Sequence, residues 1–239
     1  KKSMTTSNPI DTFFSYIENK DEDAAIHYLA EQGKNFNVNC VKHGCLAIIY
    51  AVEKGMMRLF DSIVKHPTFD TNVHDCLLET PMISFISRYC NISELEESWT
   101  KVYEKEFYSI ASSLMSHPTF DPNNDNRYSK ETALDLACNY PNLSRLVEML
   151  VKNRNVNVNH VNTFKNTPLL NCLVSENTRA LAALGRRPDL VVKDYDRKIA
   201  NEHGINLEDY IKPSEDVYDD NWLGAINNAE VSVAASAAY

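Results

Sequence analysis

Apolar residues recur along the chain at the spacing of short amphipathic helices. Two stripes occupy positions i, i+3, i+4, i+7 and i+8, which form one face of a helix. They are Phe107, Ile110, Ala111, Leu114 and Met115, and then Leu143, Leu146, Val147, Leu150 and Val151. Residues 56–64 follow the same pattern. Such helices are too short to bury an apolar face alone, so the pattern predicts an all-α solenoid of stacked units.

Polar markers repeat in phase with these stripes. Four segments end in an asparagine: Asn35–Asn39, Thr68–Asn72, Thr119–Asn123 and Asn155–Asn159. A second marker follows three of them, as Thr80-Pro81, Thr132-Ala133 and Thr167-Pro168. Threonine caps a helix and proline suits its first position, so each marker predicts a helix start. Each unit is therefore interpreted as two short helices, with a hairpin loop before the next unit.

This set of markers resembles the ankyrin-repeat family. The match rests on Thr167-Pro-Leu169, Thr132-Ala-Leu-Asp-Leu-Ala137 and Asn157-Val-Asn159. The resemblance implies an ankyrin-repeat domain over 1–211, with about five helix-turn-helix units joined by hairpins. The units are expected at 9–39, 45–72, 80–123, 132–159 and 167–192, with a partial closing unit at 195–211.

The sequence departs from the family pattern in several places. The first unit begins at Asn8-Pro9, which predicts a divergent cap, and the third carries an insert near 91–103 that is expected to extend its second helix backwards. Leu78, Lys130 and Lys165 stand where the family has a turn glycine. Because glycine alone adopts a positive φ cheaply, we expect these hairpins to differ from the usual tight geometry.

Residues 212–239 leave the repeat pattern. This segment is acidic over Glu215–Asp220 and then low in complexity, apart from the apolar pair Trp222-Leu223. We expect a loosely ordered tail. A short partner-binding motif around Tyr218–Leu223 is the alternative.

Composition limits the partners. The chain carries 24 Lys and Arg against 33 Asp and Glu, a net charge of −9. That balance disfavours nucleic-acid binding, which depends on clustered cations. No apolar run approaches a membrane span. Six irregularly spaced cysteines favour reduced thiols and a cytoplasmic location.

Two clusters contain the residue types of a chemical site. Cys40, His43 and Cys45 are possible zinc ligands, but they lack a fourth ligand at a matching spacing and are interpreted as hairpin residues. His74-Asp75-Cys76 contains the groups of a thiol-protease relay, yet adjacent side chains point in different directions. The repeated His66-Pro and His117-Pro are expected to stop helices and bond their last carbonyls. The sequence therefore predicts no metal, no cofactor and no catalytic residue.

The resemblance implies that hairpin tips and first-helix surfaces form a concave face for a partner protein. Aromatic residues and arginine dominate such interfaces. We therefore predict six partner-binding residues, which combine tip positions with late first-helix positions: Leu77, Arg88, Tyr128, Tyr140, Thr163 and Phe164.

We thus predict a monomeric, non-enzymatic protein-protein interaction module. Its irregular repeats are similar in style to the ankyrin effectors that intracellular bacteria or viruses direct at host proteins, which would place it in the host cytosol. The alternatives are the scaffold part of a larger enzyme and a thiol-dependent hydrolase.

Overall fold

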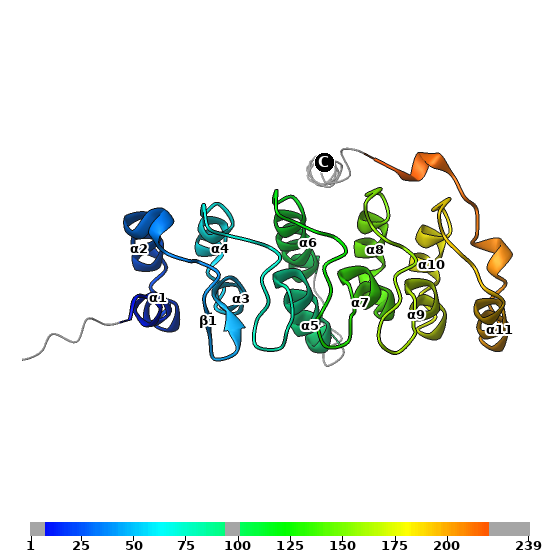
Figure 1. The fold of residues 1–239 in the computed structure, drawn as a ribbon, viewed down its shortest axis with the longest axis horizontal. Coiled ribbons are helices and arrows are strands. Elements are labelled where there is room, and N and C mark those ends of the chain that lie inside the picture. Colours follow the sequence, from blue (N-terminus) through cyan, green and yellow to red (C-terminus); the bar gives the residue numbers. More distant parts are fainter. Residues whose placement is uncertain (1–7, 94–100, 220–239) are drawn as a thin grey trace, which may run out of the picture.

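The computed structural model describes residues 8–93 and 101–219, and it consists of paired antiparallel helices stacked in a single row (Figure 1). The predicted all-α stack of helix pairs is confirmed. One layer, the inner helices, contains α1 (Pro9–Glu18), α3 (Ala47–Glu53), α5 (Pro81–Ser93), α7 (Ala133–Asn139), α9 (Pro168–Val174) and α11 (Asp194–Glu202). The other layer, the outer helices, contains α2 (Glu22–Gln32), α4 (Met57–Val64), α6 (Lys101–Met115), α8 (Ser144–Leu150) and α10 (Thr178–Leu184).

Short elements complete the stack. A two-stranded hairpin joins β1 (Val41–Lys42) to β2 (Cys45–Leu46) in antiparallel register. The described residues also form four 3-10 turns, η1 (Gly33–Asn35), η2 (Pro141–Leu143), η3 (Leu207–Asp209) and η4 (Glu215–Val217). The inner helices form the lower row in Figure 1 and the outer helices the upper row.

Three inner helices, α5, α7 and α9, begin at the capping threonines that the sequence predicted. Thr132 Oγ1 accepts from the backbone N–H of Asp135 at 3.2 Å, and the Asp135 carboxylate accepts from the Thr132 N–H in return. Thr167 Oγ1 accepts from Leu170 N at 3.2 Å. These bonds satisfy N–H groups that the first helical turn leaves free.

Closing asparagines connect each unit to the next. Asn123 is typical: its Oδ1 accepts from Asn157 N at 2.7 Å and its Nδ2 donates to Asn155 O at 2.7 Å. Asn39, Asn72 and Asn159 repeat the arrangement on the following unit. The motif that defined the repeat in sequence is therefore a hydrogen-bonded ladder along the stack, which we call the asparagine ladder.

The third unit is longer than its neighbours. Helix α5 has 13 residues and α6 has 15, whereas α7 and α8 have 7 each. The insert thus accompanies a longer first helix as well as the longer second helix that the sequence predicted. Residues 94–100, including Trp99, lie outside the described residues.

The chain folds back after α11. Residues 212–219, which we call the strap, run along the outer helices α8 and α10 (Figure 1). Lys212 N donates to Gly185 O at 2.9 Å, and Val217 is buried. Over these residues the expected loose tail is wrong, because the strap packs on the stack. Residues 220–239, with the Trp222-Leu223 pair, lie outside the described part.

Candidate functional site: the hairpin edge

Three hairpins between units share one construction. Each starts with an Asp or Asn whose side-chain oxygen accepts backbone N–H groups of the turn. Asn162 Oδ1 accepts from Phe164 N and Asn166 N, both at 3.0 Å. Asp75 and Asn126 do the same in the two preceding hairpins. These Asx turns fix the tips by local hydrogen bonds, so the tip geometry depends little on tip side chains.

The turn residues adopt the left-handed conformation without glycine. Leu78, Lys130 and Lys165 have φ of 64°, 59° and 68°. The expectation that these hairpins depart from tight geometry is therefore wrong. The Asx bonds described above hold the turn closed, which offsets the cost of roughly 1–2 kcal/mol for an L-residue at positive φ.

Adjacent hairpins are also bonded to each other. Arg127 N donates to Leu78 O at 3.1 Å. Thr163 donates to Ser129 O through both its N–H and its Oγ1, each at 2.9 Å. The tips from the third to the fifth unit therefore form one continuous edge. We call this surface, with residues 73–79, 125–131 and 160–166, the hairpin edge.

Four of the predicted binding residues lie exposed on the hairpin edge. Leu77 is 60% exposed, Tyr128 78% and Phe164 65%. Thr163 is exposed too, but its hydroxyl is engaged by Ser129. Exposed aromatic and leucine side chains on a hydrogen-bonded backbone are available for contact at a small ordering cost.

The other two predicted residues lie deeper. Arg88, on α5, pairs through Nη1 with Glu53 Oε1 at 2.6 Å and donates through Nε to Ser84 Oγ at 3.3 Å. Tyr140 is half-buried at the end of α7, where its ring packs against the core. The structure thus brings Leu77, Tyr128, Thr163 and Phe164 to one edge, and sets Arg88 and Tyr140 back from it.

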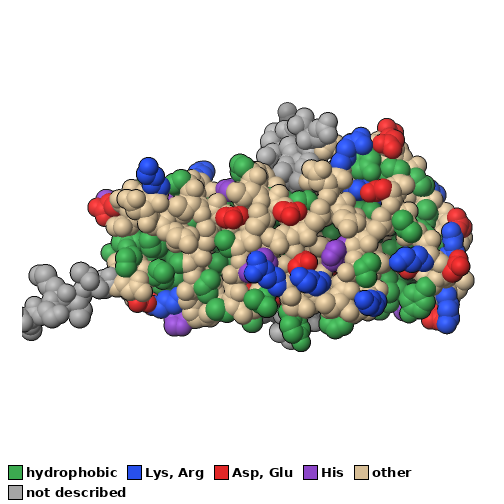
Figure 2. All heavy atoms as spheres, in the orientation of Figure 1, with side chains coloured by type: hydrophobic (Ala, Val, Ile, Leu, Met, Phe, Trp, Pro, Cys, Tyr) green, Lys and Arg blue, Asp and Glu red, His purple; other side chains and the backbone are tan. Residues whose placement is uncertain are grey.

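Further exposed apolar residues join this side. Among the described residues, the exposed large apolar side chains lie on the hairpin edge, on inner helices or, for Val191, in the loop before α11. Those that the site prediction missed are Leu78, Val161, Val174, Val191 and Tyr195. Hydrophobic side chains protrude along the lower edge of the molecule in Figure 2. Leu78 and Val161 could have been found from their places beside the tips, whereas Tyr195 required the position of α11.

The first hairpin differs from the later ones. Its tip residues are Lys42, His43 and Gly44, with Gly44 at φ of 79°. Lys42 Nζ lies 3.3 Å from Glu18 Oε1, and His43 Nε2 lies 3.2 Å from the same oxygen. The pKa of Glu18 is lowered, and the hydrogen bond from Lys42 is the main cause. The polar, ion-paired tip of the first hairpin contrasts with the later tips, which expose Leu77, Tyr128 and Phe164, the last two beside cations of their own hairpins.

Burial and hydrogen bonding set the ionisation of groups near the edge. Burial raises the pKa of Glu79, whose carboxylate accepts from Ser87 Oγ at 3.1 Å. His160 Nδ1 lies 2.7 Å from the buried Asp135 Oδ2, and this hydrogen bond raises the pKa of His160. A protonated His160 therefore ties the last hairpin to helix α7.

The two candidate chemical clusters consist of side chains that are hydrogen-bonded within the fold, buried or, for Cys76, exposed. His74 Nε2 faces the Asp125 carbonyl at 3.0 Å, and Asp75 Oδ2 accepts from Ser84 Oγ at 3.1 Å, while Cys76 is exposed. These three side chains do not form a nucleophile, base and orienter chain. Burial raises the pKa of Cys40 and of Cys45 to about 12, so both are held as thiols. Within the described residues, no group of three or more His, Cys, Asp or Glu side chains is placed to hold a metal ion.

The two His-Pro motifs have a structural role. The N–H of Thr68 donates to His66 Nδ1 at 3.3 Å, and the N–H of Thr119 donates to His117 Nδ1 at 3.3 Å. The imidazole therefore receives a bond from the following turn. Burial lowers the pKa of both histidines, which favours this neutral acceptor form.

Comparison with known proteins gives the class of fold. No family model matches the sequence, and no curated protein matches it. The structure is similar to the crystal structure of an ankyrin repeat domain from Acinetobacter baumannii AYE, with a TM-score of 0.60 and 18% sequence identity over 90% of this chain and 97% of that one. The chain therefore has an ankyrin-repeat fold, as the sequence markers predicted. No helix in the described ranges is long and apolar enough to cross a membrane.

Proposed function

We propose that the protein binds a partner protein through the hairpin edge and acts without catalysis of its own. The fold favours a protein-interaction module. The single observation that carries the proposal is the distribution of exposed apolar residues. Leu77, Tyr128 and Phe164 stand on successive hairpins at 60–78% exposure. Water-exposed apolar groups in a row are typical of an interaction surface.

The rigidity of the edge supports this use. Asx turns and the hairpin-to-hairpin bonds hold Tyr128 and Phe164 on a fixed backbone. A preformed surface loses less conformational entropy on binding than a mobile one. Tyrosine and phenylalanine at its centre would supply hot-spot contacts of roughly 2 kcal/mol or more each.

Position-specific photocrosslinking tests the proposal. A benzophenone amino acid is placed at 77, 128 or 164 on the hairpin edge, and at 105 as a control. Lys105 is exposed on the outer helix α6. We expect the same crosslinked partner from the three edge positions and none from position 105. A partner captured equally from 105, or from 105 alone, would overturn the proposal.

We further propose that the protein is an effector that acts in the cytosol of a host cell. The support is the style of its divergence, with non-glycine turns at Leu78, Lys130 and Lys165 and a lengthened third unit. A fusion to a reporter enzyme that is active only in host cytosol tests it. Reporter signal in host cells during infection is expected, and retention of the fusion inside the source cell would contradict the proposal.

A further inference from the structure

The strap lies on the outer side of the stack, away from the hairpin edge. It is held by backbone hydrogen bonds: Ser214 N donates to Arg186 O at 2.8 Å, and Asp219 N donates to Lys152 O at 3.2 Å. Just before the strap, Tyr210 passes close to Gly185. A Cβ on Gly185 would lie only 2.2 Å from the Tyr210 carbonyl oxygen. The stack therefore offers a track on which an extended segment lies with its backbone in contact.

Tyr218 occupies a seat that the stack forms from its own residues. Its ring lies 4.0 Å from the guanidinium carbon of Arg154 and 4.9 Å from that of Arg187. Its hydroxyl donates to Asp189 Oδ1 at 3.3 Å. Arg187 is fixed without help from the strap, because it donates to the carbonyls of Val151, Asn153 and Val156 at 3.0–3.1 Å. The seat for an aromatic ring is thus built into the fourth and fifth units.

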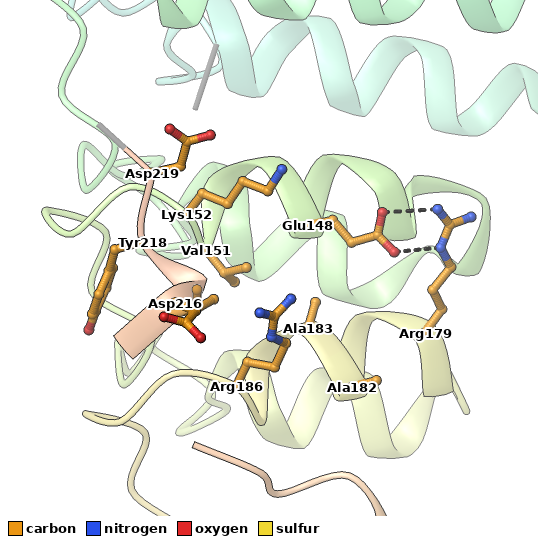
Figure 3. Close-up of a pocket in the computed structure, with 11 residues that line it drawn as sticks. Glu148, Val151, Lys152, Arg179, Ala182, Ala183, Arg186, Asp216, Tyr218 and Asp219 are labelled. Atoms are coloured by element: carbon orange, nitrogen blue, oxygen red, sulfur yellow. Dashed lines mark hydrogen bonds and ion pairs between the residues drawn. The ribbon is translucent and has the colours of Figure 1, made fainter. Parts of the chain in front are cut away.

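Charge around the seat matches the strap. In this region Glu148 pairs with Arg179 and Asp189 pairs with Arg187. The stack's remaining cations here are Lys152, Arg154 and Arg186, and the strap supplies the acids Glu215, Asp216 and Asp219. Arg154 Nη1 lies 3.5 Å from Glu215 Oε2. Figure 3 shows Lys152, Arg186, Asp216 and Asp219 around one opening. The surface therefore fits an acidic segment with a tyrosine.

The strap does not fill this surface. A pocket of about 640 Å³ remains between α8, α10 and the strap. Its floor is apolar, with Val151, Ala182 and Ala183, and Lys152 and Arg186 stand at its rim (Figure 3). We call the track, the aromatic seat and this pocket together the outer groove. A longer acidic segment in the place of the strap could use the same backbone track and also cover Val151, Ala182 and Ala183, which the strap leaves open.

We propose that the outer groove is a second binding site, which takes an extended, acidic, tyrosine-containing segment of a partner protein. The strap occupies the site in cis and competes with that segment. This site is independent of the hairpin edge. A segment held in cis has an effective concentration in the millimolar range, so a free segment competes at a disadvantage.

The test uses the full chain and a fluorescein-labelled peptide with the sequence of residues 212–219. In a strap-release variant, Val217→Asp with Tyr218→Ala, burial of the new carboxylate disfavours docking, while the groove residues that the stack contributes stay unchanged. Ser214→Pro, which removes the donor to Arg186 O, is a second release variant. By fluorescence anisotropy we expect the release variants to bind the peptide at least tenfold more tightly than the wild type. Circular dichroism verifies that each variant is folded.

Two controls separate recognition from nonspecific attraction. A peptide with Glu215→Gln, Asp216→Asn and Asp219→Asn, and another with Tyr218→Ala, should each bind at least tenfold more weakly. In the wild type, excess acidic peptide should speed hydrogen exchange at the N–H groups of Ser214 and Asp219. That readout would not move if the strap were a fixed structural element.

Several results would overturn the inference. They are absence of peptide binding to both folded release variants, equal binding of the acidic and amide peptides, and unchanged strap exchange in the wild type at saturating peptide. Concentration-dependent dimers of the wild type, with the strap of one copy in the groove of another, would assign the site to a second copy and also overturn it.

Discussion

The two long sides of the stack are built from the same units and have opposite surfaces. The hairpin edge exposes Leu77, Tyr128 and Phe164 above turns that are closed by local hydrogen bonds. The outer side at the fourth and fifth units is basic and buries the whole of Arg187. Arg127, Lys130 and Lys165 are also exposed on the hairpin edge. The difference shows that one repeat architecture can present open apolar and basic side chains on one side and a charged surface covered by the strap on the other.

Substitution of Arg187 should produce the largest loss in the free energy of unfolding, because Arg187 holds the outer side of the stack together. Arg187→Met leaves the carbonyls of Val151, Asn153 and Val156 without this donor and removes the ion pair of Asp189. Each buried acceptor left without a donor costs roughly 1–3 kcal/mol. Urea unfolding measures the loss. The control Arg179→Met removes an exposed pair with Glu148 and should cost about 1 kcal/mol or less. Equal losses in the two variants would refute the buried role of Arg187.

Substitutions in the asparagine ladder should give the second-largest loss in the free energy of unfolding. Asn123→Ala removes the bonds to Asn155 O and Asn157 N, and should lower the free energy of unfolding by about 1–3 kcal/mol. Asn139→Ala, at the end of α7, is the matched control and should have a smaller effect. Thermal or urea unfolding compares them. If the ladder variant is as stable as the control, the connection between units does not depend on the ladder.

The stability that the hairpin edge gains from His160 should depend on pH. Its pKa is raised by Asp135, so the pair stabilises the fold below the unfolded pKa of about 6.5 and loses this contribution as pH rises through the folded pKa. His160→Gln should therefore be most destabilising near pH 5.5, with a smaller difference from wild type near pH 8. Unfolding at both pH values measures it, with the exposed His27→Gln as control. A difference that grows with pH would contradict this sign.

His66, which is buried, and His117, which is half-buried, have the opposite dependence on pH. Burial lowers the pKa of His66 and of His117, so their contribution is lost as pH falls below about 6.5. The pH profile of the wild type therefore combines both trends, which is why the His160 variant has to be compared with wild type at each pH.

Turn strain should give the smallest effect. Lys165→Gly relieves roughly 1–2 kcal/mol of backbone strain at positive φ, but the added freedom of the unfolded chain costs about 0.5–1 kcal/mol. The substitution should therefore be neutral or stabilising by up to about 1.5 kcal/mol. Lys65→Gly, at φ of −83°, should destabilise instead. Urea unfolding distinguishes the signs. A clear destabilisation by Lys165→Gly would mean that the lysine side chain, and not its backbone, matters at the tip.

The sequence predicted the stack because its markers have local physical roles. Thr132 and Thr167 cap helices, and Asn123 bonds the next unit, so these positions are constrained in type and visible without a structure. The hairpin geometry was predicted wrongly from Lys130 and Lys165. Their backbone is held by Asn126 and Asn162, which lie several residues earlier, and the absence of glycine alone did not reveal this.

The positions on the hairpin edge, the candidate site, could be predicted in part because each has a fixed place within the repeat. Tyr128 and Phe164 follow from their offset within the unit, and they are exposed as that offset implies. Tyr140 shows the limit of the offset, because its ring packs against the core. The strap was not predictable, since the seat for Tyr218 joins Arg154, Arg187 and Asp189 from different loops.

One measurement tests the central claim, that the hairpin edge binds the partner. With the partner identified by crosslinking, its dissociation constant is compared for wild type, Tyr128→Ala with Phe164→Ala, and the outer-side control Glu104→Ala with Lys105→Ala. We expect the edge variant to weaken binding by at least about thirty-fold, which corresponds to roughly 2 kcal/mol, and the control to match wild type. Unchanged affinity in a folded edge variant would contradict the account.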